Sequence, residues 1–244
     1  MRPNRRELLT AAAAATALAA VGRGSPARAA QAAARAGAES TTKAAASAAA
    51  PAESNLITRP IPASGETLPA IGVGTARRYQ GAATEEALAP LRAAVRAFVA
   101  AGGKVIDTAP SYGDAEAVVG RLLAELGLRG SVFLATKVGA QGREAGMAEI
   151  ERSFANLRTE VIDLIAVHNL RDVDTQLATL RELKQQGRIR YLGVTTSFAR
   201  QHEPLAALIR RERLDFVQVD YAVDNRAAAQ TVQIGRAVQQ ECRD

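Results

Sequence analysis

The sequence lacks the residues from which disulfide frameworks and metal centres are built. It contains one cysteine, Cys242, and two histidines, so no internal disulfide framework can form and no Cys/His cluster has metal-ligand spacing. It also lacks a basic excess outside its first part: seven of the 31 basic and two of the 25 acidic residues lie in Met1–Lys43, which leaves 24 basic and 23 acidic residues from Ala44 onward. We therefore expect neither a metal nor a nucleic acid partner.

No apolar run near the N-terminus is long enough for a stable membrane span. Residues 1–29 instead combine the pair Arg5–Arg6, an Ala-rich run and the small-residue site Ala27–Ala29, which is the layout of a secretory signal peptide. The arginine pair resembles signals of the twin-arginine pathway, which exports folded proteins. An Ala-rich helix or a disordered arm is the alternative. We expect a periplasmic or otherwise exported protein that meets the export machinery through this signal, followed by a disordered linker at 30–54.

From residue 55 onward, short apolar runs alternate with amphipathic stretches, a pattern typical of β/α units around a parallel sheet. A turn signal at Ser64–Gly65 predicts a hairpin ahead of the first run. Six strands are predicted, at 70–74, 104–107, 132–137, 164–168, 190–195 and 216–220. Helices are predicted near 115–126, 148–157, 173–186 and 203–211, after an earlier helix that holds Pro90 in its first turn and ends at Gly102–Gly103. Two architectures fit this alternation, an open doubly wound sheet and a closed (β/α)8 barrel.

Polar side chains stand at or just past the ends of five successive predicted strands: Asp107, Lys137, His168, Thr195 with Thr196, and Gln218. In a parallel barrel these ends converge on one rim, where barrel enzymes keep their chemistry. An open sheet also binds ligands at its carboxyl edge. Against the open sheet, no G-x-G-x-x-G motif opens a helix, and Gly72–Gly74 is a weak signal.

Five segments resemble motifs of the aldo-keto reductases. "VIDTAPSYG" is similar to their Asp-Thr-Ala and Tyr-Gly signature, "FLATK" to their lysine strand, "IDLIAVHN" to their histidine strand, "YLGVTTS" to their Gly-Val-Ser-Asn segment and "FVQVDY" to their glutamine strand. The similarity runs from about residue 57 to 226. It implies a (β/α)8 TIM barrel that reduces an aldehyde or ketone with a nicotinamide cofactor, with a catalytic set of Asp107, Tyr112, Lys137 and His168.

Carbonyl reduction calls for these residue types independently of the family. Hydride transfer builds negative charge on the carbonyl oxygen, so a proton donor must lie within hydrogen-bond reach of it. Tyr112 is that acid, Lys137 favours its ionised form, and Asp107 keeps Lys137 charged and oriented. A neutral N–H of His168 polarises the carbonyl. Lys137 alone could instead be a Schiff-base nucleophile, but that role leaves the Asp–Tyr pair without a function.

The resemblance also implies how the cofactor is held: the nicotinamide carboxamide by Asn169, Thr195, Thr196 and Gln218, and the pyrophosphate side by Gly74 and Thr75. An ordinary tight turn is the alternative for the last two. Thr196 stands where relatives have an asparagine, so one amide contact is missing. Arg77 and Arg78 stand where many relatives have an aromatic residue, which alters the substrate pocket. We expect NADP, with NAD not excluded.

The barrel is expected to be incomplete. A full barrel takes about 250 residues, whereas residues 55–233 number 179, short by about two β/α units of about 30 residues each. We expect truncation after the sixth unit. The closing "IGRAVQQECRD" at 234–244 resembles a translated sequencing-library adapter, and our hypothesis is that the natural reading frame continues; a divergent helical tail is the alternative. Cys242 then carries no information on redox state.

Three functions remain open at this point. The leading one is a carbonyl reductase that acts on a small-molecule substrate. The second is a nucleotide-binding regulatory or partner subunit on the same barrel. The third is an inactive truncated fragment. The sequence indicates neither the substrate's identity nor the oligomeric state.

Overall fold

A parallel sheet organises residues 56–81 and 84–229, which a computed structural model describes. The predicted signal peptide at 1–29, the linker at 30–54 and the closing segment at 234–244 lie outside these described residues. The predicted barrel-like segment, 55–233, is therefore the part of the chain whose architecture can be compared with the expectations above.

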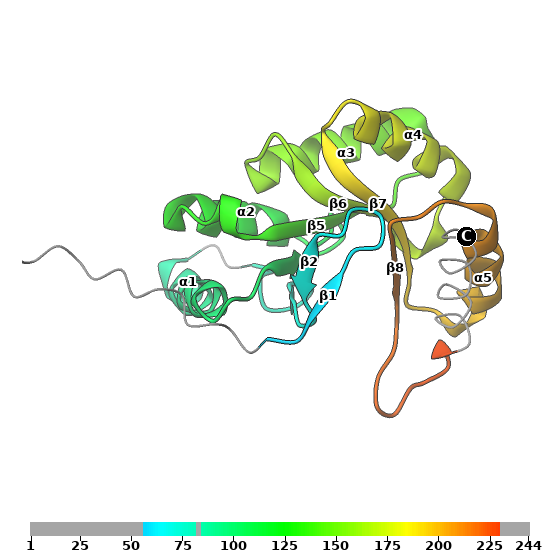
Figure 1. The fold of residues 1–244 in the computed structure, drawn as a ribbon. Coiled ribbons are helices and arrows are strands. Elements are labelled where there is room, and N and C mark those ends of the chain that lie inside the picture. Colours follow the sequence, from blue (N-terminus) through cyan, green and yellow to red (C-terminus); the bar gives the residue numbers. More distant parts are fainter. Residues whose placement is uncertain (1–55, 82–83, 230–244) are drawn as a thin grey trace, which may run out of the picture. The chain divides into compact units, whose positions relative to one another are not determined.

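Six strands form this sheet, and each pairs in parallel with the next one along the chain (Figure 1): β3 (Val73–Gly74), β4 (Val105–Asp107), β5 (Phe133–Val138), β6 (Ile162–Val167), β7 (Ile189–Thr196) and β8 (Phe216–Val219). A doubly wound sheet reverses its strand order at a switch point. The sequential order seen here, in a sheet that curls, is that of neighbouring strands in a barrel, which confirms the predicted fold class.

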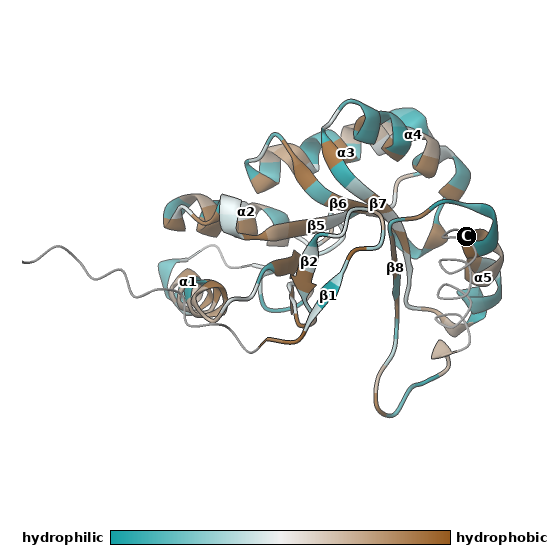
Figure 2. Cartoon of the chain, viewed as in Figure 1, coloured by the Kyte–Doolittle hydropathy of each residue, from teal (hydrophilic) through white to brown (hydrophobic). Residues whose placement is uncertain are grey.

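Five helices of the described segments follow the strands and cover one face of the sheet: α1 (Glu85–Ala100), α2 (Ala115–Leu126), α3 (Arg143–Leu157), α4 (Val173–Gln185) and α5 (His202–Arg211). Three short 3₁₀ turns lie between them, η1 (Arg129–Ser131), η2 (His168–Leu170) and η3 (Ala199–Gln201). In Figure 2 the helices carry both hydrophobic and hydrophilic colours, as amphipathic helices on a buried sheet do. Within the described segments, no helix is both long and apolar enough to cross a bilayer.

A hairpin covers the other face of the sheet, called the inner face below. Its strands are β1 (Thr58–Pro60) and β2 (Thr67–Pro69), and its turn contains Gly65 at φ +74°, which confirms the predicted turn. The hairpin joins a second apolar cluster made by Ile61, Leu68, Phe133, Ala135, Leu164 and Tyr191. These sheet residues lie in the first halves of their strands, so the hairpin closes the amino end of the inner face and leaves the carboxyl end to the polar residues.

Two helix starts differ from the prediction. Helix α1 begins at Glu85, so Pro90 lies inside it rather than in its first turn. The Thr84 side chain caps the helix by accepting a hydrogen bond from the backbone N–H of the third helical residue. Two glutamates in the first turn interact favourably with the positive end of the helix dipole. Both contacts stabilise a helix start ahead of the proline. Helix α3 begins at Arg143, five residues before the predicted start, directly after Gly142 at φ +80°.

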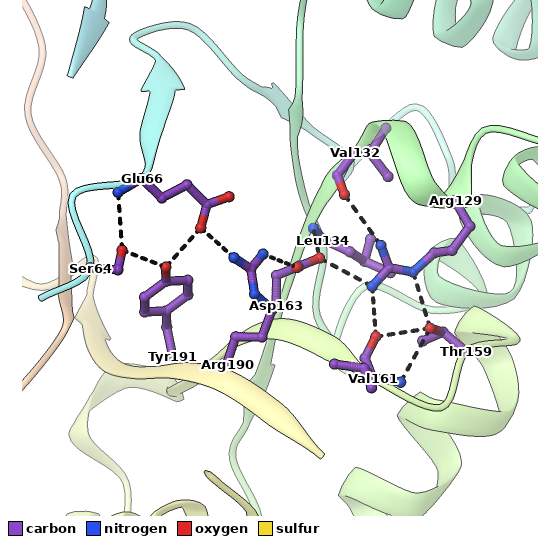
Figure 3. A network of polar contacts seen from close by, with 10 residues as sticks. All are labelled: Ser64, Glu66, Arg129, Val132, Leu134, Thr159, Val161, Asp163, Arg190 and Tyr191. Atoms are coloured by element: carbon purple, nitrogen blue, oxygen red, sulfur yellow. Dashed lines mark hydrogen bonds and ion pairs between the residues drawn. The ribbon is translucent and has the colours of Figure 1, made fainter. Parts of the chain in front are cut away.

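A polar network ties the hairpin and three strands together (Figure 3). The buried Asp163 carboxylate accepts hydrogen bonds from the backbone N–H of Leu134 at 2.8 Å, from Arg129 at 3.1 Å and from Arg190 at 2.7 Å. Arg190 also pairs with Glu66 of the hairpin. Because a buried carboxylate is stable only with such partners, this network fixes the hairpin against the sheet.

Candidate active site

The alternation of side chains along the strands explains why polar groups gather at one edge of the inner face. Successive residues of a strand point to opposite faces, so every second residue shares a face. On β5 the inner face runs from Phe133 through Ala135 to Lys137, and on β4 from Val105 to Asp107. Each strand therefore passes from the apolar cluster to a charged residue at its carboxyl end.

Lys137 and Asp107 form a buried ion pair at this edge. The Lys137 side chain is 3% exposed. Its Nζ donates to both carboxylate oxygens of Asp107, at 2.9 and 2.8 Å, and to the backbone oxygen of Thr108 at 2.8 Å. An ammonium has three N–H donors, and all three are used here. The lysine is thus held as a charged, fixed group, which is unsuited to the Schiff-base role.

Tyr112 lies in the loop between β4 and α2, close to this ion pair. Its backbone N–H donates to the carbonyl oxygen of Ala109 at 3.0 Å, and Gly113 follows at φ +59°, so a tight turn fixes its position. The Lys137 Nζ lies 5.1 Å from the centroid of the Tyr112 ring. A positive charge this close attracts the ring and also any negative charge that develops on the phenol oxygen.

His168 faces Tyr112 across the same edge. The two rings meet edge to face, with centroids 6.2 Å apart and planes at 88°. Burial, and next the positive charge of Lys137, hold the pKa of His168 below its usual value, while Asp107 opposes this shift. The imidazole is therefore neutral at neutral pH. Ser111 Oγ lies 3.5 Å from Nδ1, a contact that sequence reasoning missed although Ser111 directly precedes Tyr112.

Two of the predicted cofactor residues are neighbours on the inner face. Thr195 of β7 and Gln218 of β8 are paired in register. Within residues 56–81 and 84–229, neither side chain forms a hydrogen bond, so a hydroxyl and an amide remain available side by side. Asn169, next to His168, uses its side-chain oxygen to accept from the backbone N–H of Ser197 at 3.0 Å. Its amide N–H groups are not used in that bond.

The other three predicted cofactor residues lie differently. Thr196 is on the opposite, helix-covered side of β7, where its hydroxyl is 2.5 Å from the side-chain oxygen of Gln201. Thr75 is fully buried, and its hydroxyl donates to the backbone oxygen of Asp107 at 3.0 Å, so it ties the end of β3 to the end of β4. Gly74 pairs with Asp107 at the end of β3. The structure therefore does not bring Thr196 to the edge occupied by Lys137 and His168.

A pocket of about 1090 Å³ opens at the carboxyl ends of the strands. It is lined in part by Ser111, His168, Asn169, Arg171 and Arg200, which come from the loops after β4, β6 and β7. Within the described part of the chain, no group of three or more His, Cys, Asp or Glu side chains is arranged to hold a metal ion. The imidazole of His168 lines this cavity, whereas Tyr112 and Lys137, which contribute the phenol and the ammonium, are not among its lining residues.

Comparison with known proteins gives consistent results. The model of the "Aldo/keto reductase family" matches residues 70–234. The chain is 34% identical over 129 residues to Aldo-keto reductase YhdN of Bacillus subtilis, covering 47% of this chain and 39% of that protein. It is 38% identical over 136 residues to Methylglyoxal reductase YeaE of Escherichia coli, covering 53% and 46%. The chain thus spans less than half the length of these relatives. An aldo-keto reductase of Klebsiella pneumoniae, solved in complex with NADPH, aligns with a TM-score of 0.59 and 27% identity over 74% of this chain and 66% of that chain.

Proposed function

The chain belongs to the aldo/keto reductase family, and on this premise we propose that the protein reduces an aldehyde or ketone with a nicotinamide cofactor. NADPH is favoured because the solved relative from Klebsiella pneumoniae binds it. Methylglyoxal, which the relative from Escherichia coli is named for reducing, is a small dicarbonyl of the kind proposed here. It is a suitable first substrate to assay.

One observation carries the proposal. Lys137, held by Asp107, lies 5.1 Å from the ring of Tyr112, which in turn faces His168. Asp107 and Tyr112 belong to β4 and the loop after it, Lys137 belongs to β5, and His168 follows β6. Their proximity at one edge depends on the strand register seen in the sheet. A phenol, an ammonium and a neutral imidazole together can deliver one proton to an oxygen while stabilising negative charge on it.

The residues present fit a nicotinamide cofactor. A carboxamide has both N–H donors and an acceptor oxygen, and Thr195 with Gln218 presents a hydroxyl and an amide in adjacent register positions. Asn169 adds a second amide beside His168. Thr196 is left out of this set because its hydroxyl faces Gln201.

The chemical step then assigns one task to each side chain. A nicotinamide cofactor held by Asn169, Thr195 and Gln218 would supply hydride to the carbonyl carbon. Tyr112 donates its hydroxyl proton to the carbonyl oxygen, which completes the alcohol, and regains a proton from water. Lys137 offsets the negative charge on the phenolate between these two events. His168 orients the carbonyl by donating a hydrogen bond from its neutral ring.

Replacing Tyr112 by phenylalanine tests this assignment. The change removes the proton donor and keeps the ring, so aldehyde-dependent NADPH oxidation should fall by about 10²- to 10⁴-fold. The full gene product is assayed by NADPH absorbance, and NADPH binding is followed by fluorescence. Tyr79→Phe is the matched control, because it removes a different tyrosine hydroxyl that has no hydrogen bond within the described residues.

The possible results separate the candidate functions. Unchanged turnover in Tyr112→Phe would show that another group is the acid. NADPH binding by the unmodified protein without turnover of a broad panel of carbonyl compounds would favour the nucleotide-binding partner subunit instead. Loss of turnover in the Tyr79→Phe control would mean that the assay reports on folding rather than on the proton donor.

A further inference from the structure

The pocket beside His168 contains arginines that have no acidic partner. Arg152, Arg171 and Arg200 line it. Many arginines elsewhere pair with carboxylates, as Arg188 does with Glu151. Within residues 56–81 and 84–229, the three pocket arginines form no ion pair. Three guanidinium groups therefore line one cavity together with three carboxylates, and within the described residues none of them forms an ion pair.

The carboxylates of the same pocket are already used by the protein. Three acidic residues line it, and each accepts a hydrogen bond from a protein donor: Glu116 from the Thr136 hydroxyl at 2.6 Å, Glu149 from the backbone N–H of Gly139 at 3.3 Å, and Asp172 from the backbone N–H of Gly142 at 2.6 Å and from Thr175 at 2.9 Å. These bonds hold the acidic groups in structural positions. Within the described residues the three arginine side chains form no hydrogen bond to a protein group, so they can bind an anionic ligand.

Two of the arginines are positioned close to the proposed reaction centre. The guanidinium carbon of Arg200 lies 4.2 Å from the centroid of the Phe198 ring, a cation–π contact, and within the described residues its N–H groups form no hydrogen bond. The backbone N–H of Arg171 donates to the backbone oxygen of His168 at 3.2 Å, and both residues line the pocket. Both residues are exposed to solvent, and the planar fork of guanidinium donors can bind a carboxylate through two parallel hydrogen bonds.

We propose that Arg171 and Arg200 make this protein selective for carbonyl substrates that carry a carboxylate. The carboxylate binds the two guanidinium groups while the carbonyl group lies against His168 and Tyr112. This inference rests on the proposed reductase function and adds the class of substrate to it. A phosphate of the cofactor has the same anionic chemistry, so the experiment measures the Michaelis constant for NADPH separately.

A matched pair of aldehydes tests the proposal. 4-Carboxybenzaldehyde and 4-methylbenzaldehyde have similar shapes, but only the first is charged at neutral pH. The kcat/KM values of the full gene product are measured for both compounds, and their ratio is compared between the unmodified protein and its variants. Because each aldehyde's own reactivity cancels in that comparison, the change in ratio reports on the protein.

Two substitutions remove the proposed contacts, and a third is the control. Arg171→Gln and Arg200→Gln should each lower kcat/KM for the charged aldehyde about tenfold, mainly through KM, because a charge-assisted hydrogen bond is lost. The value for the methyl compound should stay nearly constant. Arg96→Gln, on the exposed side of α1 and away from the pocket, should leave the ratio unchanged.

Ionic strength gives an independent measurement on the same protein. Raising the salt concentration from about 0.01 M to about 1 M shortens the Debye length from about 30 Å to about 3 Å. The preference for the charged aldehyde should shrink in the unmodified protein and stay constant in a variant that carries both Arg171→Gln and Arg200→Gln. The proposal would be overturned if the ratio of kcat/KM for the charged aldehyde to kcat/KM for the methyl compound were equal in the unmodified protein and in both arginine variants. A raised KM for NADPH with an unchanged aldehyde ratio would overturn it too, and would assign the arginines to the cofactor.

A binding measurement separates this inference from the reductase function. Calorimetry with 4-(hydroxymethyl)benzoate, the reduced form of the charged aldehyde, needs no turnover. If neither aldehyde is reduced, the proposed function fails, and tight binding of this acid that is lost in Arg171→Gln still supports the arginine site. If the aldehydes are reduced but the acid binds no better than 4-methylbenzyl alcohol, the arginine site is refuted and the reductase function stands.

Discussion

Asp163 provides the sharpest test of what stabilises this fold. Its side chain is 7% exposed, and one oxygen, Oδ2, accepts from both Leu134 and Arg129, while Oδ1 accepts from Arg190 at 2.7 Å. Asp163→Asn keeps the shape of the side chain but removes its charge. If the amide oxygen takes the Oδ2 position, the amide N–H₂ faces Arg190, donor against donor. The bond to Arg190 is then lost, and that to Arg129 loses its charge assistance.

The expected cost follows from these two changes. A hydrogen bond to a charged group contributes about 1.5–3 kcal/mol. Arg129 and Arg190 are 29% and 42% exposed and can turn toward water, so the lower end of that range applies to each. We therefore expect the free energy of unfolding to fall by about 3 kcal/mol. Breaking a fully buried ion pair costs about 3–5 kcal/mol, so this value lies at the lower end of that range. For a domain of this size, that loss lowers Tm by about 6–12 °C.

Urea denaturation followed by far-ultraviolet circular dichroism measures this change. The control is Asp174→Asn, which breaks the pair between Asp174 and Arg211, whose side chains are 76% and 57% exposed. An exposed pair contributes about 0–1 kcal/mol, so the control should unfold almost as the unmodified protein does. If Asp163→Asn and Asp174→Asn have the same midpoint, the network does not stabilise the hairpin against the sheet, and the reasoning is refuted.

Three further predictions address packing, protonation and export. Gly120→Ala would place a Cβ atom 2.2 Å from a backbone oxygen of α3 and should destabilise the protein by at least about 1–3 kcal/mol, measured by thermal unfolding. In the control Gly130→Ala, the added Cβ atom meets no atom within 4 Å, so the stability should not change. In the folded state, burial lowers the pKa of His168 from its usual value of 6.5, so protonation of the imidazole favours the unfolded chain. As the pH falls from about 7 to about 5, the unmodified protein should therefore lose more stability than His168→Gln does. Parallel profiles of stability against pH for the two proteins would contradict this. Changing Arg5 and Arg6 to lysine should block export to the periplasm, measured by cell fractionation, and unchanged export would exclude the twin-arginine signal.

The order and type of the elements could be predicted because they depend on local patterns. Alternating apolar runs of strand length and helical periods are encoded within about ten residues, so strands such as β5 and helices such as α2 were found close to their true bounds. The starts of α1 and α3 were missed for two different reasons. The first depends on the Thr84 cap, a weak local signal beside the stronger one of Pro90. The second depends on a bond from the backbone of Gly142 to Asp172, 30 residues away.

The candidate site divides in the same way. Asp107, Lys137 and His168 were identified because each ends an apolar run, and a strand end is visible in the chain itself. That Thr196 faces Gln201, away from this edge, depends on which side of β7 is inner. The face is set by the pairing register with β6 and β8, which residue spacing along a single strand does not contain.

Local sequence therefore determines that this chain forms β/α units with polar residues at the strand ends. Whether those units become a doubly wound sheet or the curled, sequentially ordered sheet seen here depends on which strands pair, and that is decided by contacts between distant segments. Glu66 and Arg190 show the same dependence, because they meet across 124 residues of chain. Arg171 is close to His168 in the sequence, but Arg152 and Arg200 reach the same pocket only after folding, because they come from distant segments.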